Sequence, residues 1–364
     1  MTTPRPNALT RCGAWVALRQ CAVVVLMLAL GAPAHAWFDM TAAATATAVA
    51  TASTPAGAGE VRAWLTRIHD AASHRNYRGT VVVSGGGVVA SARIAHYINA
   101  AGQYEHSEAL DGPPRLVYRH NDLVHTVWPA ARVSLIEQRS LLASFPALLQ
   151  SGDDRIADFY DVHAEGVERV AGHEANVLRV TPRDAMRYGY RLWADRASGL
   201  LLRADVLGER GEVLETSAFS EVTIGVKAQP QSVLLPMKRL DGHRVLRAPL
   251  TPMRLESQGW TLRQPAPGFR PVSCVSRPMQ ESGLPEREGP AAPALQAIYS
   301  DGLTYVSMFI EPFDARRHTK SMLAAAGPTQ TLMVQHGDWW VTVVGDVPAA
   351  TLRWFAKNLE LTPK

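Results

Sequence analysis

The sequence predicts an α+β protein in which a large curved antiparallel sheet precedes a smaller second domain. Three observations predict it: short β-rich runs joined by tight turns, few helical stripes, and a proline-rich break over residues 226–252. Consecutive strands joined by turns form antiparallel meanders, because parallel units need longer helical crossovers. A sheet of about ten strands curls, so we expect a half-barrel with short helices against its concave face.

The first 36 residues are typical of a cleaved Sec signal peptide. Three arginines precede an apolar core over residues 21–30, and a small-His-small triplet ends at Ala36. A membrane anchor is the alternative, but a spanning helix needs about 20 apolar residues, roughly twice the length of this core. We therefore predict cleavage after Ala36 and export to the periplasm.

Removal of this segment leaves a nearly neutral chain. The sequence has 37 Lys and Arg against 33 Asp and Glu, and three arginines but no acid lie in residues 1–36, so the remainder has 34 against 33. No basic run replaces them, so we expect no nucleic-acid partner. Cys274 is then the only thiol left, which excludes an internal disulfide. A buried small side chain is the favoured interpretation of Cys274, and a reactive thiol is the alternative.

The mature chain is expected to begin with a flexible leader and one helix. The leader is assigned to residues 37–59. Residues 41–59 are almost entirely Ala, Thr, Gly and Ser and lack the large apolar groups that offset ordering entropy. From residue 60 to about Asn76, an apolar stripe at helical spacing predicts an amphipathic helix. The stripe consists of Val61, Trp64, Leu65, Ile68 and Ala72.

The first domain continues as two groups of strands with short helices between them. Turn residues separate the strands. The strands are expected at 79–84, 92–99, 103–109, 115–120 and 123–128, then at 166–170, 175–181, 188–194, 200–207 and 213–223. Residues 140–150 and 155–160 are predicted to be short helices that cover the sheet. The Gly85-Gly86-Gly87 run lies between two strands and therefore predicts a hairpin turn rather than a dinucleotide loop.

The second domain follows the proline-rich break, which we interpret as a linker stiffened by proline. Its strands are expected at 258–264, 269–276, 295–300, 304–310, 329–335 and 339–345, with a loop over 278–293. The chain closes on a helix with Pro348 in its first turn. Leu352, Phe355, Ala356 and Leu359 share one face of that helix.

The motifs of common enzyme classes are missing from the sequence. It holds no Gly-x-Ser-x-Gly elbow, no His-Glu-x-x-His pair, no phosphate loop and no Cys-x-x-Cys. We therefore predict a protein that is not an enzyme and has no catalytic residue, cofactor or metal.

An aromatic and basic strand is the most distinctive feature that remains. Tyr188, Tyr190 and Leu192 fall on one strand face, and Arg191 and Trp193 fall on the other. One face could supply an apolar lining while the arginines meet phosphate or carboxylate. An ordinary core with a solvated outer face is the alternative.

Nine short strings in order along the chain carry a family resemblance. They are Asn76-Tyr77-Arg78-Gly79, Leu110-Asp111-Gly112-Pro113-Pro114-Arg115, Phe145-Pro146-Ala147-Leu148-Leu149, Arg169-Val170-Ala171-Gly172, Arg187-Tyr188-Gly189-Tyr190-Arg191-Leu192-Trp193, Gly199-Leu200-Leu201-Leu202, Tyr299-Ser300-Asp301-Gly302-Leu303, Phe309-Ile310-Glu311-Pro312 and Val341-Thr342-Val343-Val344-Gly345. With these strings the chain resembles the MucB/RseB family of periplasmic regulators of envelope-stress sigma factors.

The resemblance implies a fold and a function. It implies an unclosed, antiparallel LolA/LolB-like β-barrel with an apolar cavity over residues 60–225, a linker over 226–252, and a smaller α+β MucB/RseB C-terminal domain over 253–364. It further implies binding to the periplasmic segment of an RseA/MucA-type anti-sigma factor, which shields that segment from site-1 proteolysis. Lipid A, lipopolysaccharide or another acyl lipid would release the hold, and membrane association would come only through the partner. A lipid or lipoprotein carrier is the alternative function.

Two sets of site residues follow from this interpretation. Lipid contact is assigned to Phe145, Leu148, Tyr160, Tyr190 and Leu192 as lining, with Arg187 and Arg191 for acidic head groups. Partner contact is assigned to Tyr305, Ser307, Phe309 and Glu311, which alternate with Val306, Met308 and Ile310 along one strand. A plain two-layer core is the alternative for that strand. Ser300-Asp301-Gly302 is expected to form a turn with Gly302 at positive φ.

Overall fold

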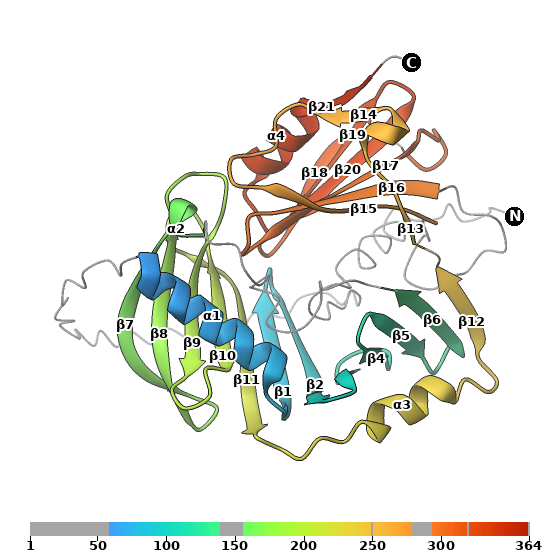
Figure 1. The fold of residues 1–364 in the computed structure, drawn as a ribbon. Coiled ribbons are helices and arrows are strands. Elements are labelled where there is room, and N and C mark those ends of the chain that lie inside the picture. Colours follow the sequence, from blue (N-terminus) through green and yellow to red (C-terminus); the bar gives the residue numbers. More distant parts are fainter. Residues whose placement is uncertain (1–57, 139–155, 249, 279–292, 319, 363–364) are drawn as a thin grey trace, which may run out of the picture.

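The computed structural model describes residues 58–138, 156–248, 250–278, 293–318 and 320–362 (Figure 1). These residues form two sheet-based domains, each with helices packed against its sheet. Among the described residues, no helix has both the length and the apolar character needed to cross a membrane.

The first domain is one twelve-stranded sheet whose two end strands do not pair with each other. The strands run in the order β12-β6-β5-β4-β3-β2-β1-β11-β10-β9-β8-β7, and all neighbours are antiparallel except β12 and β6. The strands are β1 (Tyr77–Gly85), β2 (Val88–Asn99), β3 (Gly102–Ala109), β4 (Leu116–His120), β5 (Leu123–Trp128), β6 (Val133–Gln138), β7 (Tyr160–Val170), β8 (His173–Pro182), β9 (Gly189–Asp195), β10 (Leu201–Leu207), β11 (Val213–Ile224) and β12 (Arg244–Ala248). The predicted unclosed sheet is confirmed.

Helix α1 (Ala58–His74) covers one half of this sheet and lies across the strands around β10 (Figure 1). Its Leu65 and Ile68 share a core cluster with Tyr190 and Leu192 of β9. Trp64, Leu65 and Ile68 of the predicted helical stripe therefore face the core. The four-residue helix α2 (Ile156–Phe159) closes the same half.

The other half of the sheet is covered by a segment that we expected to be a linker. Helix α3 (Gln231–Lys238) packs Val233 and Met237 against Tyr104 and Tyr118 of β3 and β4. Strand β12 then adds to β6 in parallel. The expected linker therefore contains a helix and a strand, because an apolar i, i+4 pair anchors α3 and the ladder with β6 anchors β12.

The first domain differs from the prediction in two further places, and one predicted helix lies outside the described residues. Strand β6 was not predicted, because its sequence Val-Ser-Leu-Ile-Glu-Gln is buried on both faces and lacks a period of two. Strand β7 begins at Tyr160 rather than at residue 166, with a bulge between Ala164 and Gly166. The helix expected at 140–150 lies outside the described residues.

The second domain contains a seven-stranded antiparallel sheet in the order β13-β15-β16-β17-β20-β19-β18. Its elements are β13 (Thr251–Pro252), β15 (Arg270–Pro278), β16 (Pro293–Ser300), β17 (Tyr305–Pro312), β18 (Met322–Ala326), β19 (Thr329–His336), β20 (Trp339–Gly345) and α4 (Ala349–Asn358), with a short helix η2 (Glu256–Gln258) and a two-stranded ribbon of β14 (Trp260–Leu262) and β21 (Leu359–Leu361). Strand β18 was not predicted. The strand expected at 258–264 is shorter and pairs only with β21.

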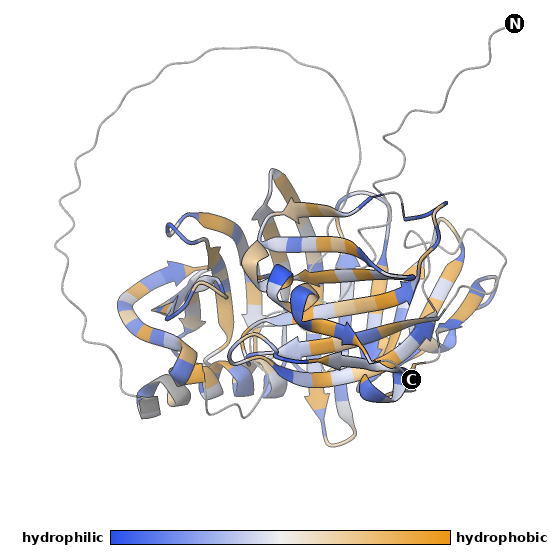
Figure 2. Cartoon of the chain, turned by 90° about the horizontal axis from the view of Figure 1, so that it is seen from above, coloured by the Kyte–Doolittle hydropathy of each residue, from blue (hydrophilic) through white to orange (hydrophobic). Residues whose placement is uncertain are grey.

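The core of the second domain lies between α4 and one face of its sheet. Met308 and Val343 of the sheet pack there with Phe355 of α4, so the predicted closing helix and its apolar face are confirmed. Apolar and polar residues alternate along many of the strands in Figure 2, as expected for strands with unlike faces.

Candidate functional site

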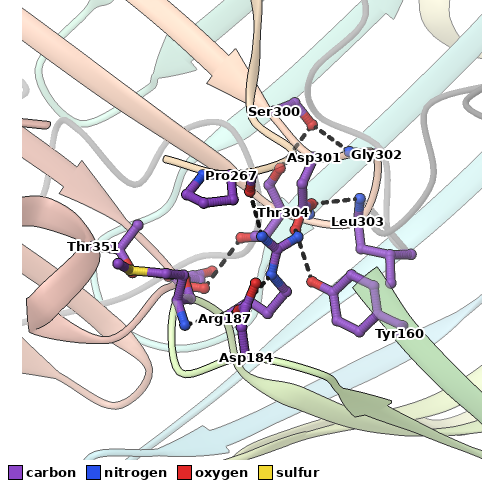
Figure 3. Close-up of polar contacts among 12 residues, drawn as sticks. Tyr160, Asp184, Arg187, Pro267, Ser300, Asp301, Gly302, Leu303, Thr304 and Thr351 are labelled. Carbon is purple, nitrogen blue, oxygen red and sulfur yellow. Dashed lines mark hydrogen bonds and ion pairs between the residues drawn. The ribbon is translucent and has the colours of Figure 1, made fainter. Parts of the chain in front are cut away.

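The loop between β8 and β9 meets the turn between β16 and β17 where the two domains join (Figure 3). Arg187 of the loop has a side chain with no exposed surface. Its Nη1 donates to Asp301 Oδ2 at 2.9 Å, its Nε donates to Asp184 Oδ1 at 3.0 Å, and its Nη2 donates to the carbonyl of Pro267. Every nitrogen of this guanidinium therefore has an acceptor within the protein.

The turn at Asp301 is held by hydrogen bonds within the turn itself, in addition to those that it makes with the first domain. Asp301 Oδ1 accepts from the backbone N–H groups of Leu303 and Thr304 at 3.0 and 2.9 Å. Gly302 has φ +99°, as predicted. Asp301 Oδ2 then accepts from Arg187 and, at 2.8 Å, from the hydroxyl of Tyr160. One carboxylate thus fixes the turn and binds the first domain.

Apolar contacts surround this ion pair. Leu303 is 4 % exposed and belongs to the core cluster of the first domain, so the second domain contributes a side chain to the core of the first. The ring centroids of Phe159 and Phe269 lie 4.6 and 5.4 Å from the Arg187 Cζ. A Cβ at Gly268 would lie 2.8 Å from the Phe159 ring, so this close approach requires glycine.

The electrostatics reflect the burial of the pair. Burial raises the pKa of Asp301 above its ordinary value, although the N–H of Thr304 and the charge of Arg187 oppose that rise. Burial, with a further effect from Asp301, raises the pKa of Tyr160 well above its ordinary value. Tyr160 therefore remains a hydroxyl donor. The cost of removing both charges from water offsets most of their attraction, so such a pair adds little net stability to the fold. Removal of one partner is nevertheless destabilising, because it leaves a buried charge uncompensated.

Other contacts extend the junction on both sides. Thr351 Oγ1 of α4 donates to the carbonyl of Met186 at 2.6 Å, and Arg277 Nη2 of β15 donates to Glu137 Oε1 of β6 at 3.0 Å. The turn of the β1–β2 hairpin touches the turn of the β18–β19 hairpin, where a Cβ at Gly86 would lie 2.6 Å from the Gly327 nitrogen. The expected hairpin turn is confirmed, since Gly86 and Gly87 have φ +60° and +79°.

The residues expected to contact lipid divide into four groups, one of which is Arg187 at the domain junction. Tyr160, Tyr190 and Leu192 come together, but in the tightly buried cluster under α1. Arg191 lies on the opposite strand face, where it donates to Glu165 at 2.6 Å and to Glu168 at 3.0 Å and lies over Trp193. Phe145 and Leu148 lie outside the described residues.

The structure thus gives both arginines roles other than the expected one. Arg187 joins the domains, and Arg191 belongs to an ion-pair network on the outer face of the sheet. We do not retain either arginine as a head-group ligand in this arrangement, because their guanidinium groups already have carboxylate partners.

The residues expected to contact the partner are mostly buried. Ser307, Phe309 and Glu311 are each below a tenth exposed, and Tyr305 is half-buried. Glu311 accepts from Arg317, and His318 Nε2 lies 3.4 Å from its carboxylate. The predicted alternation of faces is confirmed, since Val306, Met308 and Ile310 are in the core. The expectation of an accessible face is not met.

A second polar cluster lies beneath α3. His106, Tyr118 and His125 are cross-strand neighbours on β3, β4 and β5, and Tyr118 packs with α3. Within the described structure, His106 Nε2, His125 Nδ1 and Ser134 Oγ are buried without a hydrogen-bond partner. Burial lowers the pKa of both His106 and His125.

Metal binding and thiol chemistry would depend on the potential metal ligands and the one cysteine of the described residues. Within the described ranges, no group of three or more His, Cys, Asp or Glu side chains is arranged to hold a metal. Burial raises the pKa of the half-buried Cys274 to about 11, so its thiolate is scarce at neutral pH.

Sequence reasoning missed Asp301 as the partner of Arg187. Both residues lie in strings that carry the family resemblance, and the strings 187–193 and 299–303 meet at the junction. Their common presence in the family strings was the only feature of the sequence that could have connected them, because 114 positions separate the two residues.

Comparisons with known proteins agree with this two-domain organisation. The MucB/RseB N-terminal domain matches residues 60–237, and the MucB/RseB C-terminal domain matches residues 254–360. The sigma factor AlgU regulatory protein MucB of Pseudomonas aeruginosa is 29 % identical over 318 residues, which cover 83 % of this chain and 91 % of that protein. The sigma-E factor regulatory protein RseB of Escherichia coli K12 is 28 % identical over 251 residues, which cover 69 % and 75 %.

Solved structures give the same result. The crystal structure of MucB in complex with MucA(peri) matches with a TM-score of 0.60 and 27 % identity, and the match covers 84 % of this chain and all of that chain. The Pseudomonas aeruginosa MucA/MucB complex matches with a TM-score of 0.61 and 27 % identity over the same shares. Because both family domains match in order along one chain, the protein belongs to the MucB/RseB family.

Proposed function

We propose that this chain is a periplasmic negative regulator of an envelope-stress sigma factor. It binds the periplasmic segment of a membrane anti-sigma factor and shields that segment from site-1 proteolysis. One observation carries the proposal: the chain aligns along both domains with a MucB solved in complex with MucA(peri). The names of the curated relatives, sigma factor regulatory proteins, support it.

The geometry supports binding by a two-domain body. Arg187, Asp301 and Leu303 hold the domains against each other, so a partner that touches both domains meets a preformed surface. Preorganisation of this kind reduces the cost of ordering on binding. We expect the second domain to be required for high-affinity binding.

We further propose that an acyl lipid opposes partner binding. Tyr160, Tyr190 and Leu192 remain our candidates for acyl contact, but α1 and Leu303 cover them. A lipid that reached them would displace one of these covers and thereby disturb the junction. If lipid and partner favour different states, each weakens the other by the same factor.

Titration tests both parts of the proposal. The cognate anti-sigma periplasmic segment is titrated with and without lipid A, and its cleavage by the site-1 protease is followed with and without this chain. We expect binding and protection, both reduced by lipid A. Failure to bind contradicts the regulator, whereas binding that lipid A leaves unchanged contradicts only the lipid part.

A lipid or lipoprotein carrier is the second candidate, favoured by the unclosed sheet with its helical cover. A carrier would transfer an acylated cargo between membranes whether or not the anti-sigma segment is present. A transfer assay with labelled lipoprotein separates the two candidates.

A further inference from the structure

Among the described residues, each of the two large sheets has two edge strands, and three of these four edges are protected. Strand β7 has a bulge after Ala164 and charged residues such as Glu168. Strand β12 has Arg244 and Arg247, and β13 is only two residues long and ends in Pro252. Charges, bulges, prolines and short length are the features that keep sheet edges from pairing with other chains.

Strand β18 has no such protection. Its sequence is Met-Leu-Ala-Ala-Ala, without charge or proline, and its pairing with β19 has no register shift. Met322 and Leu323 are 40 % and 39 % exposed. An exposed, regular, uncharged edge of this kind marks a place where another strand pairs.

The register shows which backbone groups face outward. A two-residue turn, Gly327-Pro328, joins β18 to β19, so the closing pair Ala326 and Thr329 must be a hydrogen-bonded pair. Hydrogen-bonded and non-hydrogen-bonded positions alternate along an antiparallel strand. Ala324 and Met322 therefore bond to β19, and the N–H and C=O groups of Leu323 and Ala325 point away from the sheet.

We propose that the outer edge of β18 is a β-augmentation site for an extended segment of the anti-sigma factor, an inference that rests on the proposed function. The outward amides and carbonyls at alternate positions match an extended backbone rather than a helix. Exposed Lys320 just before β18 favours an acidic residue at the adjoining end of the segment.

A partner segment fits this edge better than a second copy of the chain. Two five-residue strands that pair edge to edge bury far less than the roughly 1,000 Å² that a stable interface needs. A segment of the anti-sigma factor can make further contacts, because β18 leads into the domain junction. There, Gly327 meets Gly86, and Gln330 Nε2 lies 3.5 Å from the Tyr188 hydroxyl.

The test removes one outward donor and leaves the sheet intact. Ala325→Pro deletes the outward N–H, and an edge strand accepts proline where that N–H faces solvent. Ala325→Val keeps the N–H and serves as the matched control. We expect Ala325→Pro to bind the cognate anti-sigma segment about tenfold more weakly, which corresponds to roughly one strong hydrogen bond, and Ala325→Val to bind as the parent does. Thermal unfolding verifies that both variants are folded.

Hydrogen exchange supplies an independent readout. The amides of Leu323 and Ala325 should exchange fast in the free chain and become protected in the complex. If the parent fails to bind the segment, the proposed function fails. If the parent and both variants bind equally and these amides stay unprotected, only the edge proposal fails. Protection of these amides in the free chain would overturn the proposal. Protection that does not depend on protein concentration would indicate that another segment of this chain covers the edge, and protection that rises with concentration would indicate a second copy.

Discussion

Arg187 and Asp301 illustrate how one pair of residues can depend entirely on a junction between domains. Asp301 accepts four hydrogen bonds, two from its own turn and two from the first domain. Neither side chain of the pair has exposed surface. Loss of Arg187 leaves the buried carboxylate of Asp301 without a cation, and loss of Asp301 leaves Arg187 with only the partly exposed Asp184. Such a loss is costly, whereas exposed ion pairs are screened by solvent and contribute little.

Substitution of Asp301 should therefore be costly. Asp301→Ala removes the fully buried carboxylate that pairs with Arg187 and leaves only the partly exposed Asp184, and we expect the free energy of unfolding to fall by about 3–5 kcal/mol. Chemical denaturation measures it. Glu174→Ala, which removes an exposed carboxylate paired with Arg196, is the control and should change stability little. An Asp301→Ala protein as stable as the parent would show that the pair is not closed in solution.

Leu303 gives a second prediction at the scale of one residue. Leu303→Ala removes a buried side chain that one domain inserts into the core of the other, and such changes cost about 2–5 kcal/mol. Leu361→Ala, at an exposed leucine of the same domain, should have a much smaller effect. Equal effects of the two changes in denaturant unfolding would contradict the insertion.

At the scale of elements, the half-sheet under α3 should respond to pH. Burial lowers the pKa of His106, with Arg93 adding to the effect and Glu108 opposing it, and burial and Arg247 lower that of His125. A histidine whose folded pKa lies below the unfolded value contributes stability above that value, about 6.5. This contribution is lost as the pH falls, because the unfolded chain binds the proton first.

We therefore expect the free energy of unfolding to decrease as the pH falls below about 6.5. His96 and His318, also with pKa values lowered by burial, add to the decrease. The double variant His106→Gln, His125→Gln should show a shallower decrease than the parent. Equal slopes in urea titrations at pH 5, 6 and 7 would contradict the assignment.

The same scale shows how far sequence patterns reach. Strands such as β1 and β11 were predicted because one face is buried and the side chains alternate. Strand β6 was missed because both of its faces are buried, and β18 because three consecutive alanines favour helix. Strand β12 was missed because its partner lies about a hundred residues earlier and prolines flank it. Periodicity reports burial on one side of an element, not its pairing.

At the scale of the whole molecule, the sequence alone could not predict which residues meet at the domain junction. The aromatic strand 188–193 was recognised, but its apolar face meets α1 and Leu303, which only the fold brings there. Arg187 was assigned to a lipid head group because its position beside aromatic residues is as compatible with that role as with a buried ion pair. Its actual partner is in the other domain. Local patterns identified the residues that matter at this junction, and long-range topology determined what they contact.

The junction predicts that the two domains unfold together. The pair Arg187 and Asp301, the inserted Leu303 and the hydrogen bond from Thr351 to Met186 all break if either domain unfolds alone. Calorimetry of the parent should show one transition whose van't Hoff and calorimetric enthalpies agree. The double variant Asp301→Ala, Leu303→Ala removes two of these contacts at one turn, so we expect two resolved transitions. The double variant Glu174→Ala, Leu361→Ala, at an exposed carboxylate and an exposed leucine, is the control and should retain one transition. Two transitions in the parent would show that the domains unfold independently and that the junction does not couple them.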